Sequence, residues 1–240
     1  MSELRRLNSR TVAIVLSIAL VIVVFNALTT GAYTIRFGEV FTVLFQGPAE
    51  TSDANSISHA VFWNVRLPRV ALAIVVGASL AVAGVVMQGV FRNPLAEPAT
   101  VGVSGGAAVG AVIAITLGLS KITLGVQIFA FIGGTLATAI VYGLSRVDGK
   151  TDVVTLILTG IAINALSGAL IGLAVFIADD DQIRTVTFWS LGSLGLATWR
   201  AVAVVLPLAI IGIALSTKFA RTLDLMALGD RSAAHVGVPV

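Results

Sequence analysis

The chain of 240 residues is 57% apolar and 11% charged, whereas an ordinary soluble domain carries roughly 25% charged residues. A soluble fold of this length cannot bury so much apolar surface, which excludes a disordered chain, a secreted disulfide scaffold and a typical cytosolic enzyme. The absence of cysteine also excludes thiolate catalysis and cysteine-ligated metals. The net charge of +3 does not indicate nucleic acid, because the basic residues are scattered between apolar runs. These features indicate an integral membrane protein.

Apolar runs that approach the length of a spanning helix, about 20 residues, recur along the chain. The first resembles a signal peptide, but its length and poor cleavage site favour a retained helix. A further segment, 187–197, is short and interrupted by glycine, so we interpret it as a half-helix or a re-entrant piece. The sequence predicts an all-α integral membrane protein, a polytopic bundle with six spans. These are residues 11–32, 70–91, about 103–119, 122–144, 153–178 and 201–216.

Small residues recur at helical spacing within these runs. Gly102, Gly106 and Gly110 are spaced by four residues, and so are Gly168 and Gly172. Such stripes let helix backbones approach closely in lipid, so they favour a compact bundle over separate anchors.

Charges in the loops predict the orientation. With the N-terminus inside, inner loops carry more Lys and Arg than outer loops, and the acidic run at 179–181 lies outside. Trp63, Trp189 and Trp199 then fall at the outer ends of spans, as an interfacial belt requires. We therefore expect both termini on the cytoplasmic side of a multi-pass protein.

Two apparent enzyme motifs lack their required context. Gly102 to Gly106 matches G-x-S-x-G but opens an apolar helix, and the two histidines, His59 and His235, lie near opposite faces. Residues 143–151 resemble a phosphate-binding loop but have one residue too many between the glycines. We therefore expect neither catalysis nor an ATP site in this chain.

Polar residues within or beside the spans leave several interpretations open. The acidic run at 179–181 is interpreted as a solvated loop rather than a cation site, because consecutive side chains cannot converge on one ion. We expect Gln88 and Gln127 to be buried, and they favour bonding between helices over lining of a transport path. For Asn164, midway along the fifth span, interhelical bonding and path lining stay equally open.

Arg66-Leu67-Pro68-Arg69 stands at the outer end of the second span, where positive charge is disfavoured. The two arginines could present a double cationic contact to carboxylates of an external partner, or could snorkel to the interface. On the inner side, Asn93 can cap the turn that Pro94 begins, which predicts a rigid corner or a plain turn.

The tail, residues 223–240, is neither apolar enough to span nor polar enough to be disordered. Gly229 breaks it, and Asp230 can cap a short helix that follows. Two short pieces with a kink on the inner face would suit a groove on a cytoplasmic partner.

The segment RLPRVALAIVVGASLAVAGVVMQGVFRNPLAEPATVGVSGGAAVGAV, residues 66–112, closely resembles FecCD-type permeases of ATP-binding-cassette importers for iron chelates, haem and cobalamin. The tail LDLMALGDRSAAHVGVPV resembles their cytoplasmic coupling segment. The likeness extends from about residue 10 to the last residue.

The resemblance implies a fold of ten spanning helices, working as a homodimer or close heterodimer in the bacterial cytoplasmic membrane. Two copies of a cytoplasmic ATPase would bind inside, and an extracytoplasmic substrate-binding protein would dock outside. ATP and magnesium would belong to the ATPase, so no cofactor, metal or catalytic residue is expected in this chain. Relatives continue for roughly four more helices, so we expect 1–240 to be one C-terminally truncated permease domain.

The resemblance also implies roles for particular residues. Arg66 and Arg69 would meet glutamates of the binding protein. Asn164 is a candidate for lining the path from its own position within the fifth span, and not from the resemblance. The inner gate would comprise Asn93, Leu95, Val153 and Val154. The residues entering the ATPase groove would be Leu225, Met226, Ala227, Leu228, Gly229 and Asp230.

Two other classes of function compete with the importer permease. A secondary transporter or channel would need ionisable groups at membrane depth, and none lies near a span centre. A non-transporting scaffold would need neither the outer arginine pair nor the broken inner tail. The substrate stays open, with an iron siderophore preferred over haem and haem over cobalamin.

Overall fold

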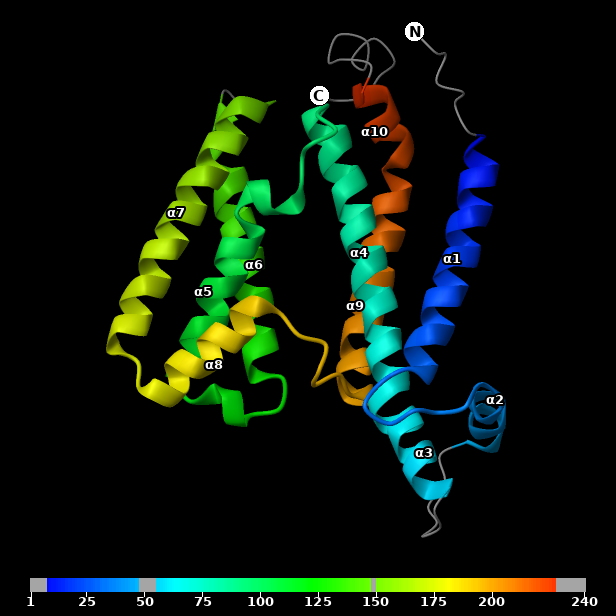
Figure 1. The fold of residues 1–240 in the computed structure, drawn as a ribbon. Coiled ribbons are helices and arrows are strands. Elements are labelled where there is room, and N and C mark those ends of the chain that lie inside the picture. The colour runs from blue at the N-terminus through cyan, green and yellow to red at the C-terminus, as the bar shows by residue number, and fades with distance from the viewer. Residues whose placement is uncertain (1–7, 48–54, 148–149, 228–240) are drawn as a thin grey trace, which may run out of the picture. The chain divides into compact units, whose positions relative to one another are not determined.

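The computed structural model describes residues 8–47, 55–147 and 150–227, and in these the fold is all-α, as predicted (Figure 1). A π-helical turn, η1 (Phe62–Arg66), joins α3 to α4, and 3-10 turns η2 (Pro98–Val101) and η3 (Leu119–Lys121) flank α5. Two-residue strands β1 (Arg146–Val147) and β2 (Lys150–Thr151) pair antiparallel. The α-helices are α1 (Ser9–Thr29), α2 (Phe37–Gln46), α3 (Asn55–Val61), α4 (Leu67–Phe91), α5 (Val103–Thr116), α6 (Gly125–Leu144), α7 (Val153–Ile177), α8 (Asp180–Leu191), α9 (Trp199–Lys218) and α10 (Ala220–Ala227).

Five helical runs in the described residues are long and apolar enough to cross a membrane. They are α1, α6, α7, α9 and one continuous run, Ile57–Phe91, so the predicted second span begins earlier than residue 70. The predicted span 103–119 instead forms the 14-residue helix α5. This helix stops early because Gly118 adopts the left-handed conformation, with φ +74°.

The segment after α7 departs from the sequence-based prediction. Asp179 caps α8 by accepting a hydrogen bond from the backbone N–H of Gln182 at 2.8 Å, and Asp180 and Asp181 form its first turn. The predicted loop at 179–181 is therefore wrong, because a carboxylate beside free N–H groups starts a helix. The short helix expected from residue 187 consequently begins at Asp180.

The chain forms two compact units, one of residues 1–75 and 194–206, the other of 76–193 and 207–240. In the first unit, Phe62 is fully buried with Ile35, Val40 and Val43 around it. Because these residues come from η1, from α2 and from the turn before it, the core fixes α2 on the helical run that leads into α4. A single domain over 1–240 stays a prediction.

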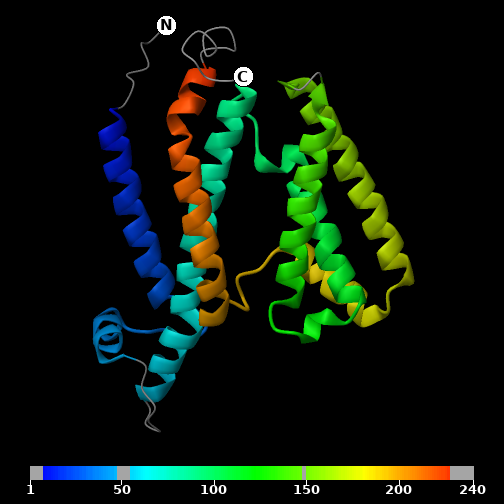
Figure 2. The ribbon, with the colours of Figure 1, turned by 180° about the vertical axis from the view of Figure 1, so that it is seen from behind.

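In the second unit, α5 packs against α6 through glycine (Figure 2). A Cβ placed on Gly106 would overlap the Gly133 carbonyl, and one on Gly110 would overlap the Phe129 carbonyl. The predicted stripe on α5 is thus confirmed as a close backbone contact. By contrast, a Cβ on Gly168 would meet no atom of the described residues within 4 Å.

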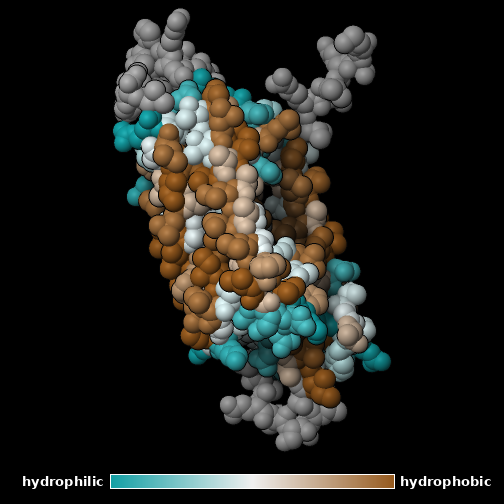
Figure 3. All heavy atoms as spheres, turned by 90° about the vertical axis from the view of Figure 1, so that its left-hand side faces the viewer, coloured by the Kyte–Doolittle hydropathy of each residue, from teal (hydrophilic) through white to brown (hydrophobic). Residues whose placement is uncertain are grey.

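The face shown in Figure 3 has a band of apolar residues between two more polar zones. On α7, Leu158, Ile161 and Leu173 are each about 60% exposed. Contiguous apolar exposure on this scale is suited to lipid rather than water.

We predict that Gly106→Ala destabilises the protein, because the new methyl group collides with the α6 backbone. Overpacking of this kind costs typically about 1–3 kcal/mol. Gly168→Ala is the matched control, and it should be neutral or slightly stabilising because alanine favours helix over glycine. Thermal unfolding in detergent measures both. Equal melting temperatures for the two variants would contradict the close α5–α6 contact.

Candidate functional site

The guanidinium of Arg66 anchors the turn between α1 and α2. Its Nη1 donates to the Leu28 carbonyl in the last turn of α1 at 2.5 Å, and its Nη2 donates to the Tyr33 carbonyl. A Cβ on Gly31 would lie 2.9 Å from Nη2, so this approach requires glycine. Since Arg66 is only 7% exposed, its guanidinium group bonds to carbonyls of this chain.

Two further donors from the same helical face bind the end of α2. Trp63 Nε1 donates to the Val43 carbonyl at 3.0 Å, and His59 Nδ1 lies 3.2 Å from the Gly47 carbonyl oxygen. These acceptors belong to the last turn and the C-cap of α2, where a helix leaves carbonyls without internal partners.

Arg69 lies in different surroundings from Arg66. It is exposed, and its Nη2 donates to the Gly195 carbonyl at 3.2 Å. In the same unit, Trp199 Nε1 donates to the Trp63 carbonyl at 2.8 Å. The motif thus presents one buried and one exposed cation, and docking of a partner by both stays a prediction.

The turn after α4 is defined by one unusual backbone position and one side-chain cap. Arg92 ends the helix with φ +50°, and the Asn93 side chain accepts from the Leu95 N–H at 2.9 Å. The expected cap by Asn93 is therefore confirmed. Leu95 projects from this turn with 86% of its surface exposed.

The far end of the connection between α4 and α5, in η2, is bonded to α7. Asn164 Nδ2 donates to the Ala99 carbonyl at 2.9 Å, and a Cβ on Gly160 would overlap the Thr100 carbonyl. A Cβ on Gly105 would lie 2.5 Å from Asn164 Oδ1. Of the two roles left open for Asn164, the structure contains the interhelical bond, and path lining stays a prediction.

The other two gate candidates, Val153 and Val154, are the first residues of α7. Asp152 caps the helix, accepting from the backbone N–H and the hydroxyl of Thr155, both at 2.7 Å. These hydrogen bonds, led by that from the hydroxyl, hold the pKa of the Asp152 carboxyl below its usual range. Val153 is half-buried and Val154 is 63% exposed, so the cap fixes where both side chains stand.

The first part of the predicted coupling segment is helical. α10 contains Leu225, Met226 and Ala227, and the first two are half-buried. Leu228, Gly229 and Asp230 lie outside the described residues.

Helix α10 packs on the end of α4, a contact that sequence reasoning did not identify. A Cβ on Gly89 would lie 3.5 Å from Leu223 Cβ, an ordinary van der Waals distance. A glycine in the last turn of an apolar helix was the available signal for such a close approach.

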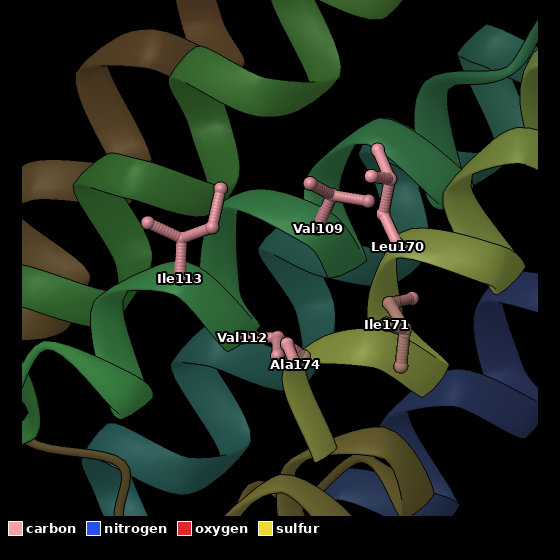
Figure 4. A pocket seen from close by; sticks show the side chains of 6 residues that line it. All are labelled: Val109, Val112, Ile113, Leu170, Ile171 and Ala174. Carbon is pink, nitrogen blue, oxygen red and sulfur yellow. The ribbon is translucent and has the colours of Figure 1, made fainter. Parts of the chain in front are cut away.

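The remaining polar residues and the groove between α5 and α7 provide fewer groups that could bind a ligand. Gln88 and Gln127 are exposed rather than buried as expected. Among the described residues, no group of three His, Asp or Glu side chains could hold a metal ion. A groove between α5 and α7 is lined only by aliphatic side chains, which offer no polar group to orient a substrate (Figure 4). These are Val109, Val112, Ile113, Leu170, Ile171 and Ala174.

The chain belongs to the FecCD transport family, whose sequence model matches residues 19–240. It is 40% identical over 98% of its length to the hemin transport system permease protein HmuU of Yersinia pestis, covering 69% of that protein. It is 41% identical over 76% of its length to the cobalamin import system permease protein BtuC of Halobacterium salinarum, covering 49%.

The fold also matches a solved structure described as an inward-facing conformation of a metal-chelate type ABC transporter. The TM-score is 0.80 at 28% identity, over 95% of this chain and 68% of the other. The predicted family is confirmed, and the chain is a multi-pass membrane permease of the ATP-binding-cassette importer class. It spans between about half and two thirds of the lengths of these relatives.

We predict that Arg66→Met destabilises the protein far more than Arg69→Met. Loss of the Arg66 guanidinium leaves two carbonyls unsatisfied, at about 1–3 kcal/mol each, whereas an exposed substitution stays within about 0.5 kcal/mol. Thermal unfolding in lipid nanodiscs measures the difference. If both variants melt alike, Arg66 does not anchor the α1–α2 turn and is free for a partner.

Proposed function

We propose that this chain forms part of the path by which an importer carries an intact metal chelate across the bacterial cytoplasmic membrane. The substrate class is haem, cobalamin or a ferric siderophore. Haem is favoured by the relative with 40% identity over nearly the whole chain, in place of the siderophore preferred from the sequence. A path walled by apolar and neutral side chains suits such a large chelate.

The observation that carries the proposal is a chain of contacts between the candidate coupling helix and the candidate gate. Leu223 of α10 packs on Gly89, in the last turn of α4. The corner of Asn93 and Leu95 follows directly from α4, and its far end is bonded to Asn164 of α7. Displacement of α10 would therefore act at once on the helix that carries the gate corner.

The partners follow from the family. Two copies of an ATPase would bind at the cytoplasmic face through α10 and the residues after it, and would supply ATP and Mg²⁺. A second permease subunit would complete the path. With the shorter apolar helix α5 as a sixth crossing, both ends of the chain would face the cytoplasm. An extracytoplasmic binding protein would dock at the opposite face, where exposed Arg69 can pair with a carboxylate and Arg66 shapes the adjoining turn.

The test is uptake by proteoliposomes that contain this chain with its candidate ATPase and binding protein. Haemin, cyanocobalamin and a ferric hydroxamate are offered in turn. We expect one of them to accumulate only when ATP is present inside and the binding protein outside. Uptake that ignores ATP, or none with any of the three, would reject the importer function.

We predict that Gly89→Leu uncouples ATP hydrolysis from uptake, because the larger side chain displaces Leu223 and with it α10. Gly89→Ala is the control, since its methyl group fits at 3.5 Å and should preserve coupling. The ratio of substrate imported to ATP hydrolysed measures the effect in the same proteoliposomes. An unchanged ratio for Gly89→Leu would separate α10 from coupling without affecting the evidence for import.

A further inference from the structure

The surface of α2 is divided into three lengthwise sectors. Val40 and Val43 are buried against the protein, at 2% and 3% exposure. Gly38, Glu39 and Thr42 form a small and polar sector, and all three are exposed. Between the buried and polar sectors runs an aromatic sector that is also exposed, comprising Phe37, Phe41, Leu44 and Phe45.

Rotation of α2 about its own axis cannot bury the aromatic sector. Val40 and Val43 pack with Phe62, and the Val43 carbonyl accepts from Trp63 Nε1. The helix is therefore fixed in rotation about its own axis, and Phe45 remains 85% exposed. A fixed exposed face of this kind needs an apolar environment supplied from outside the chain.

The aromatic sector is continuous with the apolar surface of α1. The ring of Phe25, near the end of α1, lies 4.5 Å from that of Phe37 and 5.6 Å from that of Phe41. None of the residues of α1 is buried, and α1 is one of the candidate spans. Both ribbon views show α2 lying across the end of α1 rather than continuing its direction (Figures 1 and 2).

We infer that α2 lies in the plane of the membrane surface, with Phe37, Phe41, Leu44 and Phe45 inserted at the boundary between lipid headgroups and acyl chains. A helix with an apolar face beside a polar one binds such interfaces. Lipid around the exposed side of a spanning α1 would reach the aromatic sector without a gap. Glu39 and Thr42 then face the aqueous side. The inference depends only on α1 crossing the membrane, and not on the transport activity.

The experiment uses spin labels on single cysteines, which this cysteine-free chain allows without other changes. Phe45→Cys reports the aromatic sector and Thr42→Cys, on the same helix, is the matched control. The protein is reconstituted in phosphatidylcholine–phosphatidylglycerol vesicles. Collisions with oxygen, which concentrates in lipid, are compared with collisions with a water-soluble nickel chelate.

We expect the label at position 45 to collide with oxygen far more than with nickel, and the label at 42 to show the reverse. Equal access of nickel to both labels would place the aromatic sector in water and overturn the inference. A label at 45 reached by neither reagent would overturn it too, because a protein partner or second copy would then cover the sector. Leu44→Cys repeats the test should Phe45→Cys not fold.

Discussion

The last carbonyls of a helix have no partner within that helix, and much of this structure satisfies them with side chains from segments distant in the chain. Arg66 bonds the end of α1 at Leu28, and Trp63 bonds the end of α2. Gln182 of α8 donates to the Thr116 carbonyl, the last residue of α5, at 3.2 Å. Asn164 does the same for the short turn that contains Ala99. Each donor lies at least 20 residues from its acceptor in the chain, so these bonds set tertiary position as well as satisfying the backbone.

Side-chain hydrogen bonds to backbone groups also hold the candidate gate in place. The corner after α4 has one end defined by the backbone of Arg92 and the cap of Asn93, and its other end defined by the bond to Asn164. Between these ends Leu95 is exposed and contributes little to stability. A turn that is held at both ends and exposes Leu95 and Pro94 between them agrees with the proposed gate role of this corner.

The class of fold and the longest helices could be predicted from the sequence, because the length of an apolar run is a local property that identifies a spanning helix. It was insufficient where helix limits depend on single backbone positions or on caps. Gly118 ends α5 by its left-handed backbone, and Asp179 starts α8 within a run that resembled a loop. The exposure of Gln88 and Gln127 could not be predicted either, because the neighbour of each helix face is set by tertiary packing.

Arg66 and Arg69 show why the candidate site was only partly predictable. In the sequence they are a pair of equal cations flanking Pro68, and the family resemblance assigns them one role. Their surroundings separate them, because Arg66 faces two carbonyls in different directions, which a planar guanidinium can bond together and a lysine ammonium reaches less well. An arginine engaged in this way cannot give the same donors to a partner without releasing the α1–α2 turn. Any docking surface at this end therefore depends on Arg66 for its shape and on Arg69 for its exposed charge.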